Sequence, residues 1–416
     1  MLAALKKPPR PLLLIVRRRL ATESAVNGHS AVQPPLPLPA STKSRPPSHL
    51  YPQPRPVDPS THSNRHPLPK LPPTFGRNQL LPVTDSTRAL LESIVAKFNA
   101  PIRYAFAYGS GVFEQDGRGK EGEKPPMLDF IFAVTHPEHF HSMNMQQYPA
   151  HYPLHARAFG SSYVGRVEDL GPGVWFNAYV PMNGVVIKYG VTSIDNLCND
   201  LLNWRTLYLA GRMHKPLRII KDDARVRLTQ QVNLTSAVRA ALLTLPAEFS
   251  ETQLFETITA ISYSGDPRMI LPAENRGKVG NIVRKQGPQF KELYQRLVVG
   301  LPGTYWPIHQ SEIQQDTSAR ARSFHLRKLP HNLLVRVRER FAERGVGEEL
   351  MREDENAYWM KLAADEEVLR SVVREEMSRI VRGPATVQTL KGIMTAGIGK
   401  SIKYGSAKVG KWWRGS

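Results

Sequence analysis

Residues 108–117 read YGSGVFEQDG, and an apolar run lies on either side of them. The run before them, 102–107, reads IRYAFA, and the run after them, 127–134, reads MLDFIFAV. Short runs of this composition predict buried strands. The chain is therefore expected to leave one strand through a glycine-serine turn and to carry a single carboxylate, Asp129, into the next strand.

The surrounding pattern predicts an α+β fold, with a small mixed sheet and flanking helices. A hairpin is indicated by two apolar runs around the turn sequence PMNG at 181–184. Helical stripes precede the first strand and follow the hairpin, and a further short strand separates the last two of them. The expected helices cover 86–99, 193–210 and 229–245, the hairpin strands 173–180 and 185–189, and the further strand 217–220.

Composition divides the chain into five parts. Residues 246–376 are mostly helical in pattern, which favours a second, mainly helical domain, and we find no internal repeat. The predicted parts are a presequence at 1–25, a disordered proline-rich linker at 26–79, a sheet-containing domain at 80–225, a mainly helical domain at 226–376 and a basic amphipathic tail at 377–416.

The net charge of +20 is concentrated at the two ends of the chain. Residues 1–80 carry a net charge of about +10 and residues 377–416 about +8, which leaves only about +2 for the body. An enzyme that acts on RNA is expected to have a strongly basic groove in its body. The distribution favours targeting or anionic surfaces over nucleic acid as the partner of the basic ends.

The N-terminal segment is basic and has only a short apolar core. It has no acidic residue before Glu23, and its arginines surround the short apolar run 12–16, which is typical of a mitochondrial presequence. An ordinary disordered basic tail is the alternative. Seventeen of the 35 prolines lie in the first 80 residues, a composition that cannot bury a core.

Two kinds of site are excluded or disfavoured by residue counts. Cys198 is the only cysteine, which excludes an intramolecular disulfide and a cysteine-rich zinc site. Five histidines lie between residues 136 and 155, but their spacing matches no standard zinc pattern. No apolar run approaches the roughly 18–20 residues needed to span a bilayer, so any membrane contact is expected to be peripheral.

The glycine-serine turn and the strand aspartate together suit nucleotidyl transfer. Gly109 and Gly111 let backbone N–H groups approach a phosphate, and the Ser110 hydroxyl can donate to a phosphate oxygen. Asp129 on the adjacent strand can hold a divalent metal that bridges phosphates. A tight turn beside a capped aspartate explains the same residues without any ligand, and the pattern is neither a P-loop nor a dinucleotide-binding fingerprint.

A resemblance to a known family adds to this reading. Gly109-Ser110 followed by Asp129 resembles the DNA polymerase β-like nucleotidyltransferases, although Ile131 stands where a second acid is usual in them. The fuller resemblance, over about 80–416, is to the mitochondrial phosphatidate cytidylyltransferases, also called mitochondrial CDP-diacylglycerol synthases or translocator assembly and maintenance proteins. It is carried by YGSGV (108–112), MLDF (127–130), GVWFN (173–177), IKYGV (187–191), LLNW (201–204), LYLAGR (207–212), SYSGDPRM (262–269), KVGNIV (278–283) and KGIMTAG (391–397).

The resemblance implies a reaction and a location. CMP would be transferred from CTP to phosphatidate, giving CDP-diacylglycerol and pyrophosphate for cardiolipin synthesis, with Mg²⁺ or another divalent cation as cofactor. The enzyme would sit peripherally on anionic lipids at the matrix side of the mitochondrial inner membrane. The alternative is a nucleotidyltransferase acting on RNA, or an inactive relative that serves as an assembly factor.

Further candidates come from charged residues near the motifs. We expect Asp129 and Ser110 to be catalytic, and Lys188, Arg212 and Lys215 to bind nucleotide or phosphate together with Gly109 and Gly111. Each of these cations can equally be solvated at the surface. Asp222 can supply the missing metal ligand, although Asp222 and Asp223 can equally cap a helix. Asp195 and Asp200 are weaker candidates, and Arg268, Arg276 and Lys278 can line the same phosphate pocket.

The C-terminal tail has the pattern of an interfacial helix. Val387, Leu390 and Met394 begin an apolar stripe, whereas Lys391 lies outside it. Such a segment suits an anionic lipid surface, with tryptophans at headgroup depth. The alternative is a helix packed on the protein's own core. The residues expected to contact the membrane are Lys400, Lys403, Lys411, Trp412 and Trp413.

Overall fold

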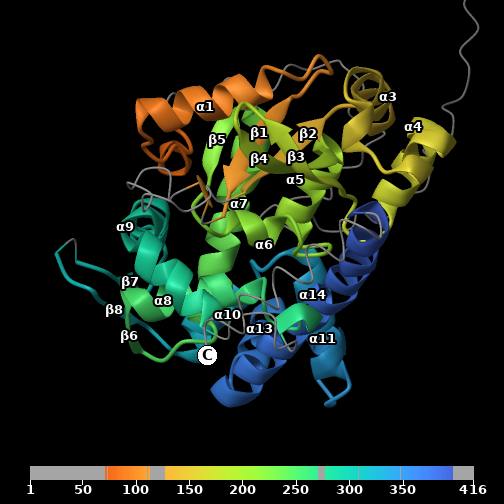
Figure 1. The fold of residues 1–416 in the computed structure, drawn as a ribbon. Helices are drawn as coiled ribbons and strands as arrows, with labels where there is room; N and C mark the ends of the chain where they lie inside the picture. The colour runs from red at the N-terminus through yellow and green to blue at the C-terminus, as the bar shows by residue number, and fades with distance from the viewer. Residues whose placement is uncertain are drawn as a thin grey trace, which may run out of the picture. The chain divides into compact units, whose positions relative to one another are not determined.

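A computed structural model describes residues 71–72, 74–109, 111–112, 127–269, 277–307, 309–346 and 348–396 (Figure 1). By their contacts, all of the described residues belong to one compact unit.

A five-stranded mixed sheet forms the centre, in the order β3-β4-β2-β1-β5. β2 and β4 are parallel, and every other neighbouring pair is antiparallel. The α+β class and the hairpin are thereby confirmed, whereas the polymerase-β-like assignment stays a prediction. The strands are β1 (Tyr104–Tyr108), β2 (Leu128–Val134), β3 (Trp175–Met182), β4 (Val185–Ser193) and β5 (Arg218–Lys221).

Helices cover both faces of this sheet. Residues of β2 alternate between two apolar clusters: Ile131 joins the cluster that includes α5 and α7, while Phe130 and Phe132 join the cluster that includes α1 and α3. Because both faces are buried, β2 is apolar on both sides except at Asp129, as the continuous run in the sequence indicated. The helices around the sheet are α1 (Asp85–Val95), α3 (Pro137–Gln147), α4 (Leu154–Asp169), α5 (Ile194–Asn203), α6 (Ala210–Met213) and α7 (Ala224–Leu242), with 3₁₀ turns at Arg77–Gln79 and Pro149–His151.

The remainder is mainly helical but contains a second sheet that the sequence pattern did not reveal. Its three strands, in the order β6-β8-β7, have only two to four residues each, too few for a periodic signal. They are β6 (Glu248–Ser250), β7 (Thr304–Tyr305) and β8 (Glu312–Gln315). The helices are α8 (Glu251–Ile261), α9 (Lys278–Val299), α10 (Ala319–Leu326), α11 (His331–Ala342), α12 (Glu348–Glu353), α13 (Glu355–Leu362) and α14 (Glu366–Ala396), with a 3₁₀ turn at Pro267–Met269.

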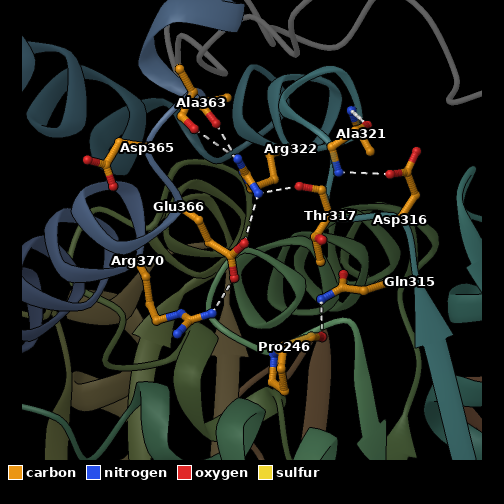
Figure 2. A network of polar contacts seen from close by, with 12 residues as sticks. Pro246, Gln315, Asp316, Thr317, Ala321, Arg322, Ala363, Asp365, Glu366 and Arg370 are labelled. Carbon is orange, nitrogen blue, oxygen red and sulfur yellow. Dashed lines mark hydrogen bonds and ion pairs between the residues drawn. The ribbon is translucent and has the colours of Figure 1, made fainter.

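Arg322 connects α10 to the start of α14 through hydrogen bonds. Its guanidinium donates to the Ala363 carbonyl at 3.0 Å and to the Glu366 carboxylate at 3.0 Å, and Glu366 also pairs with Arg370 (Figure 2). Hydrogen bonds of a charged donor to partly buried acceptors are the stronger kind. This network holds the helical part together around the N-terminal end of α14.

Several expected boundaries differ from the structure. Asn78 and Gln79, placed in the linker, are buried and donate to the Leu293 and Arg227 carbonyls. The expected boundary at 225/226 falls inside α7, which begins at Ala224 rather than 229 because Asp223 caps it. The helix expected over 193–210 ends at Asn203, since Trp204 adopts a left-handed conformation with φ 51°. The expected boundary at 376/377 falls inside α14, where Met377 and Val381 are buried.

Candidate active site

Asp129 lies where three central strands meet at one end of the sheet. It is paired with Tyr108 of β1 on one side and with Lys188 of β4 on the other. The Lys188 ammonium donates to Asp129 Oδ1 at 3.1 Å, and about a quarter of each side chain is exposed. The sheet register thus brings together the carboxylate and the lysine that the sequence singled out separately.

Gly109 brings the backbone directly against this carboxylate. Its φ is +89°, and a Cβ at that position would lie 3.6 Å from Asp129 Oδ2. Larger residues rarely adopt this conformation, so glycine is what allows the chain to turn here. Gly111 follows in a short turn, in which the Val112 N–H donates to the Gly109 carbonyl at 3.3 Å. Ser110 lies outside the described residues.

Lys188 is held in a charged state beside Asp129. Its ammonium lies 4.6 Å from the centre of the Phe176 ring. Burial alone would lower the pKa of Lys188, but the attraction of Asp129, followed by Tyr108 and Tyr208, outweighs it and raises that pKa. Asp129 is thereby partly neutralised, and Lys188 keeps a positive charge at the mouth of the site.

Arg212 adds a further positive charge to the site. Its guanidinium stacks 3.6 Å from the centre of the Tyr208 ring and lies 5.9 Å from that of Tyr108. One of its nitrogens donates to the Tyr208 carbonyl at 2.5 Å. Aromatic faces hold a guanidinium in place while leaving donors free for an anion.

Lys215 is a partly buried cation that has no carboxylate partner in the described part of the chain. Its ammonium donates to the Gly211 carbonyl at 2.5 Å and to Ser262 Oγ at 2.8 Å. Lys215 and Lys278 lie 5.0 and 5.2 Å from the centre of one ring, that of Tyr263. Burial, and after it the charges of Arg212 and Lys278, lowers the pKa of Lys215 well below the usual value. An anion bound here would relieve that repulsion.

A second glycine, Gly211, lets α6 lie close enough to Ser262 for the contact between Lys215 and Ser262. A Cβ at Gly211 would lie 2.4 Å from Ser262 Cβ, so α6 packs on the end of α8 only because residue 211 has no side chain. Just beyond that end, Arg268 forms a bidentate pair with Asp266, at 2.6 to 3.1 Å. The five cations Lys188, Arg212, Lys215, Arg268 and Lys278 form what we call the cation row; within the described residues Asp129 pairs with Lys188 and Asp266 pairs with Arg268.

Asp200 positions the loop that carries Tyr208 and Arg212. It is fully buried, and its carboxylate accepts the backbone N–H groups of Thr206, Leu207, Leu209 and Ala210 at 2.7 to 3.1 Å. Sequence reasoning treated Asp200 as a helix-surface carboxylate. The apolar neighbours Leu201 and Leu202 were the available signal that this stretch of helix is buried.

The residues fit one divalent cation only with help from substrate. In the described ranges no group of three or more His, Cys, Asp or Glu side chains is arranged to hold a metal. Mg²⁺ commonly takes one or two carboxylates and completes its shell with phosphate oxygens and water. Asp129, partly exposed and next to the phosphate-accessible turn, suits the role of the single protein carboxylate.

Asp222 is not part of this site. It pairs with Arg227, and both it and Asp223 lie near Tyr104, at the opposite end of β1 from Tyr108. Four residues of strand separate those ends, roughly 13 Å at 3.3 Å per residue. The expectation that Asp222 completes a metal site with Asp129 is therefore wrong, because strand β1 holds the two carboxylates apart. Asp195 pairs with Arg225 and is likewise occupied.

The described end of α14 contains three residues of the expected apolar stripe. Leu390 and Met394 are 62% and 40% exposed, while Lys391 is buried. Val387 is half-buried and packs against Gly171, so only part of the stripe faces away from the protein's core. No described helix is both long and apolar enough to cross a bilayer. Arg276 and the expected membrane residues Lys400, Lys403, Lys411, Trp412 and Trp413 lie outside the described residues.

Comparison with known proteins agrees with the resemblance found in the sequence. A family model described as mitochondrial phosphatidate cytidylyltransferase matches residues 91–411. A protein of that name from Saccharomyces cerevisiae is 38% identical over 82% of this chain and 74% of its own length. Those from Xenopus laevis and Danio rerio are 38% and 37% identical over 80% of this chain and 97% and 98% of their own lengths.

Proposed function

The chain belongs to the mitochondrial phosphatidate cytidylyltransferase family, and we propose that Asp129 and the cation row form the centre at which it transfers CMP from CTP to phosphatidate. The products are CDP-diacylglycerol, which serves cardiolipin synthesis, and pyrophosphate. The names of the relatives favour this enzyme over an RNA-directed nucleotidyltransferase or an inactive assembly factor.

The observation that carries the assignment of the site is the repulsion among its cations. Lys215 is partly buried, and burial, followed by the charges of Arg212 and Lys278, lowers its pKa well below the usual value. A triphosphate supplies several negative charges and many acceptor oxygens, so it suits a row of ammonium and guanidinium groups. Arg212 and Lys215 hold the phosphates, and the Gly109 turn lets backbone come close to them.

The reaction needs positioning and charge neutralisation more than proton transfer. A phosphate monoester is largely ionised near pH 7. Its oxygen attacks the α-phosphorus of CTP, the bond to the β-phosphate breaks, and the electron pair leaves with pyrophosphate. The cation row neutralises the charge that builds up on pyrophosphate, and no general base is required.

Asp129 is the residue that would hold Mg²⁺. When bound, the metal neutralises phosphate charge and orients the phosphates. Lys188 donates to one oxygen of Asp129, which keeps the carboxylate oriented toward the Gly109 turn. Ser110 is proposed to donate its hydroxyl to a phosphate oxygen, a role that follows from its place in the turn.

The location follows from the lipid substrate. The relatives are mitochondrial proteins by name. Phosphatidate stays in a bilayer, so the enzyme works as a peripheral protein on anionic lipid, at the matrix side of the inner membrane.

The test is nucleotide and acceptor specificity. The full chain is incubated with Mg²⁺, phosphatidate vesicles and each of four labelled nucleoside triphosphates in turn. We expect labelled CDP-lipid from CTP alone, and none when diacylglycerol replaces phosphatidate. Equal transfer from ATP or UTP, or absence of CDP-lipid with CTP, would overturn the proposal.

A further inference from the structure

Exposed apolar side chains of the described residues gather on two helices. Twelve large apolar side chains are strongly exposed, and half of them lie on α4, directly after it, or on the last turns of α14. A patch of this kind marks an interaction site, whereas single exposed apolar residues do not. These six residues, which we call the α4–α14 face, are Leu154 (77% exposed), Phe159 (69%), Leu170 (55%), Leu390 (62%), Ile393 (59%) and Met394 (40%).

The two helices contact each other close to three residues of the face, Phe159, Leu170 and Met394. The end of α14 lies against α4 (Figure 1), with Tyr163 Oη 3.8 Å from Met394 Sδ. The Tyr163 ring in turn lies 5.4 Å from that of Phe159. At the other end of α4, the Lys391 ammonium donates to the Leu170 carbonyl at 2.9 Å.

At the end of α14, polar side chains face the protein and apolar side chains face outward. Gln388, Lys391 and Thr395 are buried, although Leu390, Ile393 and Met394 are exposed. Lys391 fixes this orientation, because its ammonium also donates to the Glu168 carbonyl at 3.0 Å, in the last turn of α4. A cation at the C-terminal end of a helix is favourable. The apolar side of α14 is therefore presented outward by specific hydrogen bonds.

The charges around the face suit an anionic surface. Arg157 and Arg166 of α4 are exposed, and no ion pair within the described ranges involves them, although the exposed acids Asp169, next to Leu170, and Glu138, hydrogen-bonded to Ser162, also border α4. Immediately after Ala396, the chain continues for 20 residues with five Lys/Arg and no acidic residue. Apolar side chains bordered by basic residues are what binds an anionic membrane interface.

We propose that the α4–α14 face is a preformed membrane-contact surface that sits on an anionic phospholipid bilayer, with Leu154, Phe159, Leu390 and Ile393 in the headgroup region. The choice of a bilayer over another protein rests on the proposed function, because phosphatidate is delivered in one. α4 then forms a second contact beside the C-terminal tail and fixes the orientation of the enzyme on the membrane.

The first experiment measures vesicle binding of the full chain. The paired variant Leu154→Ser/Phe159→Ser is compared with Val299→Ser/Tyr305→Ser, a control in which both side chains are also more than half exposed. Loss of one large apolar contact lowers partitioning by roughly tenfold. In flotation with vesicles of phosphatidylcholine, phosphatidate and cardiolipin, we expect the paired variant to bind at least about tenfold more weakly and the control to bind like wild type. Wild-type binding by the paired variant would overturn the proposal.

Activity measurements separate this inference from the proposed function. The paired variant is expected to lose CDP-lipid formation on vesicles but to keep it on detergent-dispersed phosphatidate. If the wild-type chain makes no CDP-lipid in either form, the proposed function fails while the flotation comparison still tests the surface. Loss of CTP binding together with vesicle binding would mean damage to the fold, and the second experiment then decides.

The second experiment places an environment-sensitive fluorophore on the face. The only native thiol, Cys198, is buried, so Phe159→Cys and the control Tyr305→Cys can be labelled selectively. We expect a blue shift on adding anionic vesicles for the probe at 159 and none for the probe at 305. A probe at 159 that does not respond to vesicles would overturn the proposal; if it is already blue-shifted without them, the chain's own tail covers the face.

Discussion

Lys188 and Tyr189 are neighbours on β4, but they face opposite sides of the central sheet and two different polar environments. On the Lys188 side lie Asp129 and the cation row, partly exposed and with like charges close enough to lower the pKa of Lys215. On the Tyr189 side, the hydroxyl lies 2.7 Å from Asn144 Nδ2 and 2.8 Å from His151 Nδ1. We call these the open side and the closed side.

The closed side continues as a buried network. Tyr152 Oη lies 2.9 Å from Asn144 and 2.8 Å from His141, whose other ring nitrogen lies 2.8 Å from Glu168. Burial lowers the pKa of His141 to about 3, so its ring is neutral near pH 7, and burial also raises the pKa of Glu168 well above its usual value. Two of the clustered histidines thus serve the fold. The contrast teaches that the open side gathers like charges that an anion can relieve, whereas most polar groups of the closed side are hydrogen-bonded to one another.

The largest effect is expected from Asp129→Asn on the open side. The change keeps the shape but removes the charge that holds Lys188 and that would hold Mg²⁺, so kcat/KM should fall on the order of a thousandfold. The melting temperature should change little. The matched change on the closed side is Tyr189→Phe, which should lower stability and leave kcat/KM within a few-fold. Equal activity losses in the two variants would remove the distinction between the sides.

The next largest effect is expected from Asp200→Asn. Like the closed-side residues, Asp200 is fully buried and hydrogen-bonded inside the protein, but the loop that it holds belongs to the open side. Asparagine has an NH₂ group in place of one carboxylate oxygen, and that group cannot accept the hydrogen bonds that backbone N–H groups now donate to the oxygen. Each buried N–H group left without an acceptor costs about 1–3 kcal/mol. We expect the free energy of unfolding to fall by about 3 kcal/mol. Asp195→Asn in the same helix is the control, since its exposed ion pair is worth about 1 kcal/mol or less. A denaturant titration that finds equal losses would contradict the positioning role.

These two carboxylates also show how far the sequence could predict the site. Asp129 was found because an acid in a doubly buried strand breaks an otherwise apolar run. Asp200 was undervalued because its partners are backbone N–H groups, which carry no sequence signal. Asp222 was misplaced because the pairing order β2-β1-β5, which sets its distance from Asp129, cannot be read from local pattern. Lys215 was identified by its motif, but its burial next to Ser262 depends on the packing of α6 on α8.

Lys215→Met is expected to weaken CTP binding by about 10- to 100-fold. A hydrogen bond to a charged group is worth about 1.5–3 kcal/mol, and each 1.4 kcal/mol is tenfold in affinity. The stability of the ligand-free protein should not fall much, because the change also removes repulsion with Arg212 and Lys278. Lys291→Met is the control: that lysine is paired with Glu251 at 2.8 Å. Calorimetry with CTP measures both, and unchanged affinity in Lys215→Met would exclude it from the open side's anion site.

The smallest effect concerns Lys391, the cation that joins α14 to the closed side. Burial lowers its pKa to about 8, against the opposing attraction of Glu168 and Asp169. Between pH 8 and the unfolded value of about 10.4, the unfolded chain binds this proton more tightly than the folded chain, so stability rises with pH in that window. From pH 7.5 to 9 the gain is about 1 kcal/mol in the free energy of unfolding. Burial raises the pKa of Glu168, which contributes with the opposite sign, and the charge of Lys391 opposes that rise, so the slope is compared between proteins. Lys391→Met should lose this part of the slope, while Lys361→Met, at an exposed position of α13, should keep it. Urea titrations across this range measure the slope for the wild type and the two variants. The same slope in all three proteins would mean that the charged ammonium of Lys391 is not buried between α14 and α4. It would then not orient the apolar side of α14 outward.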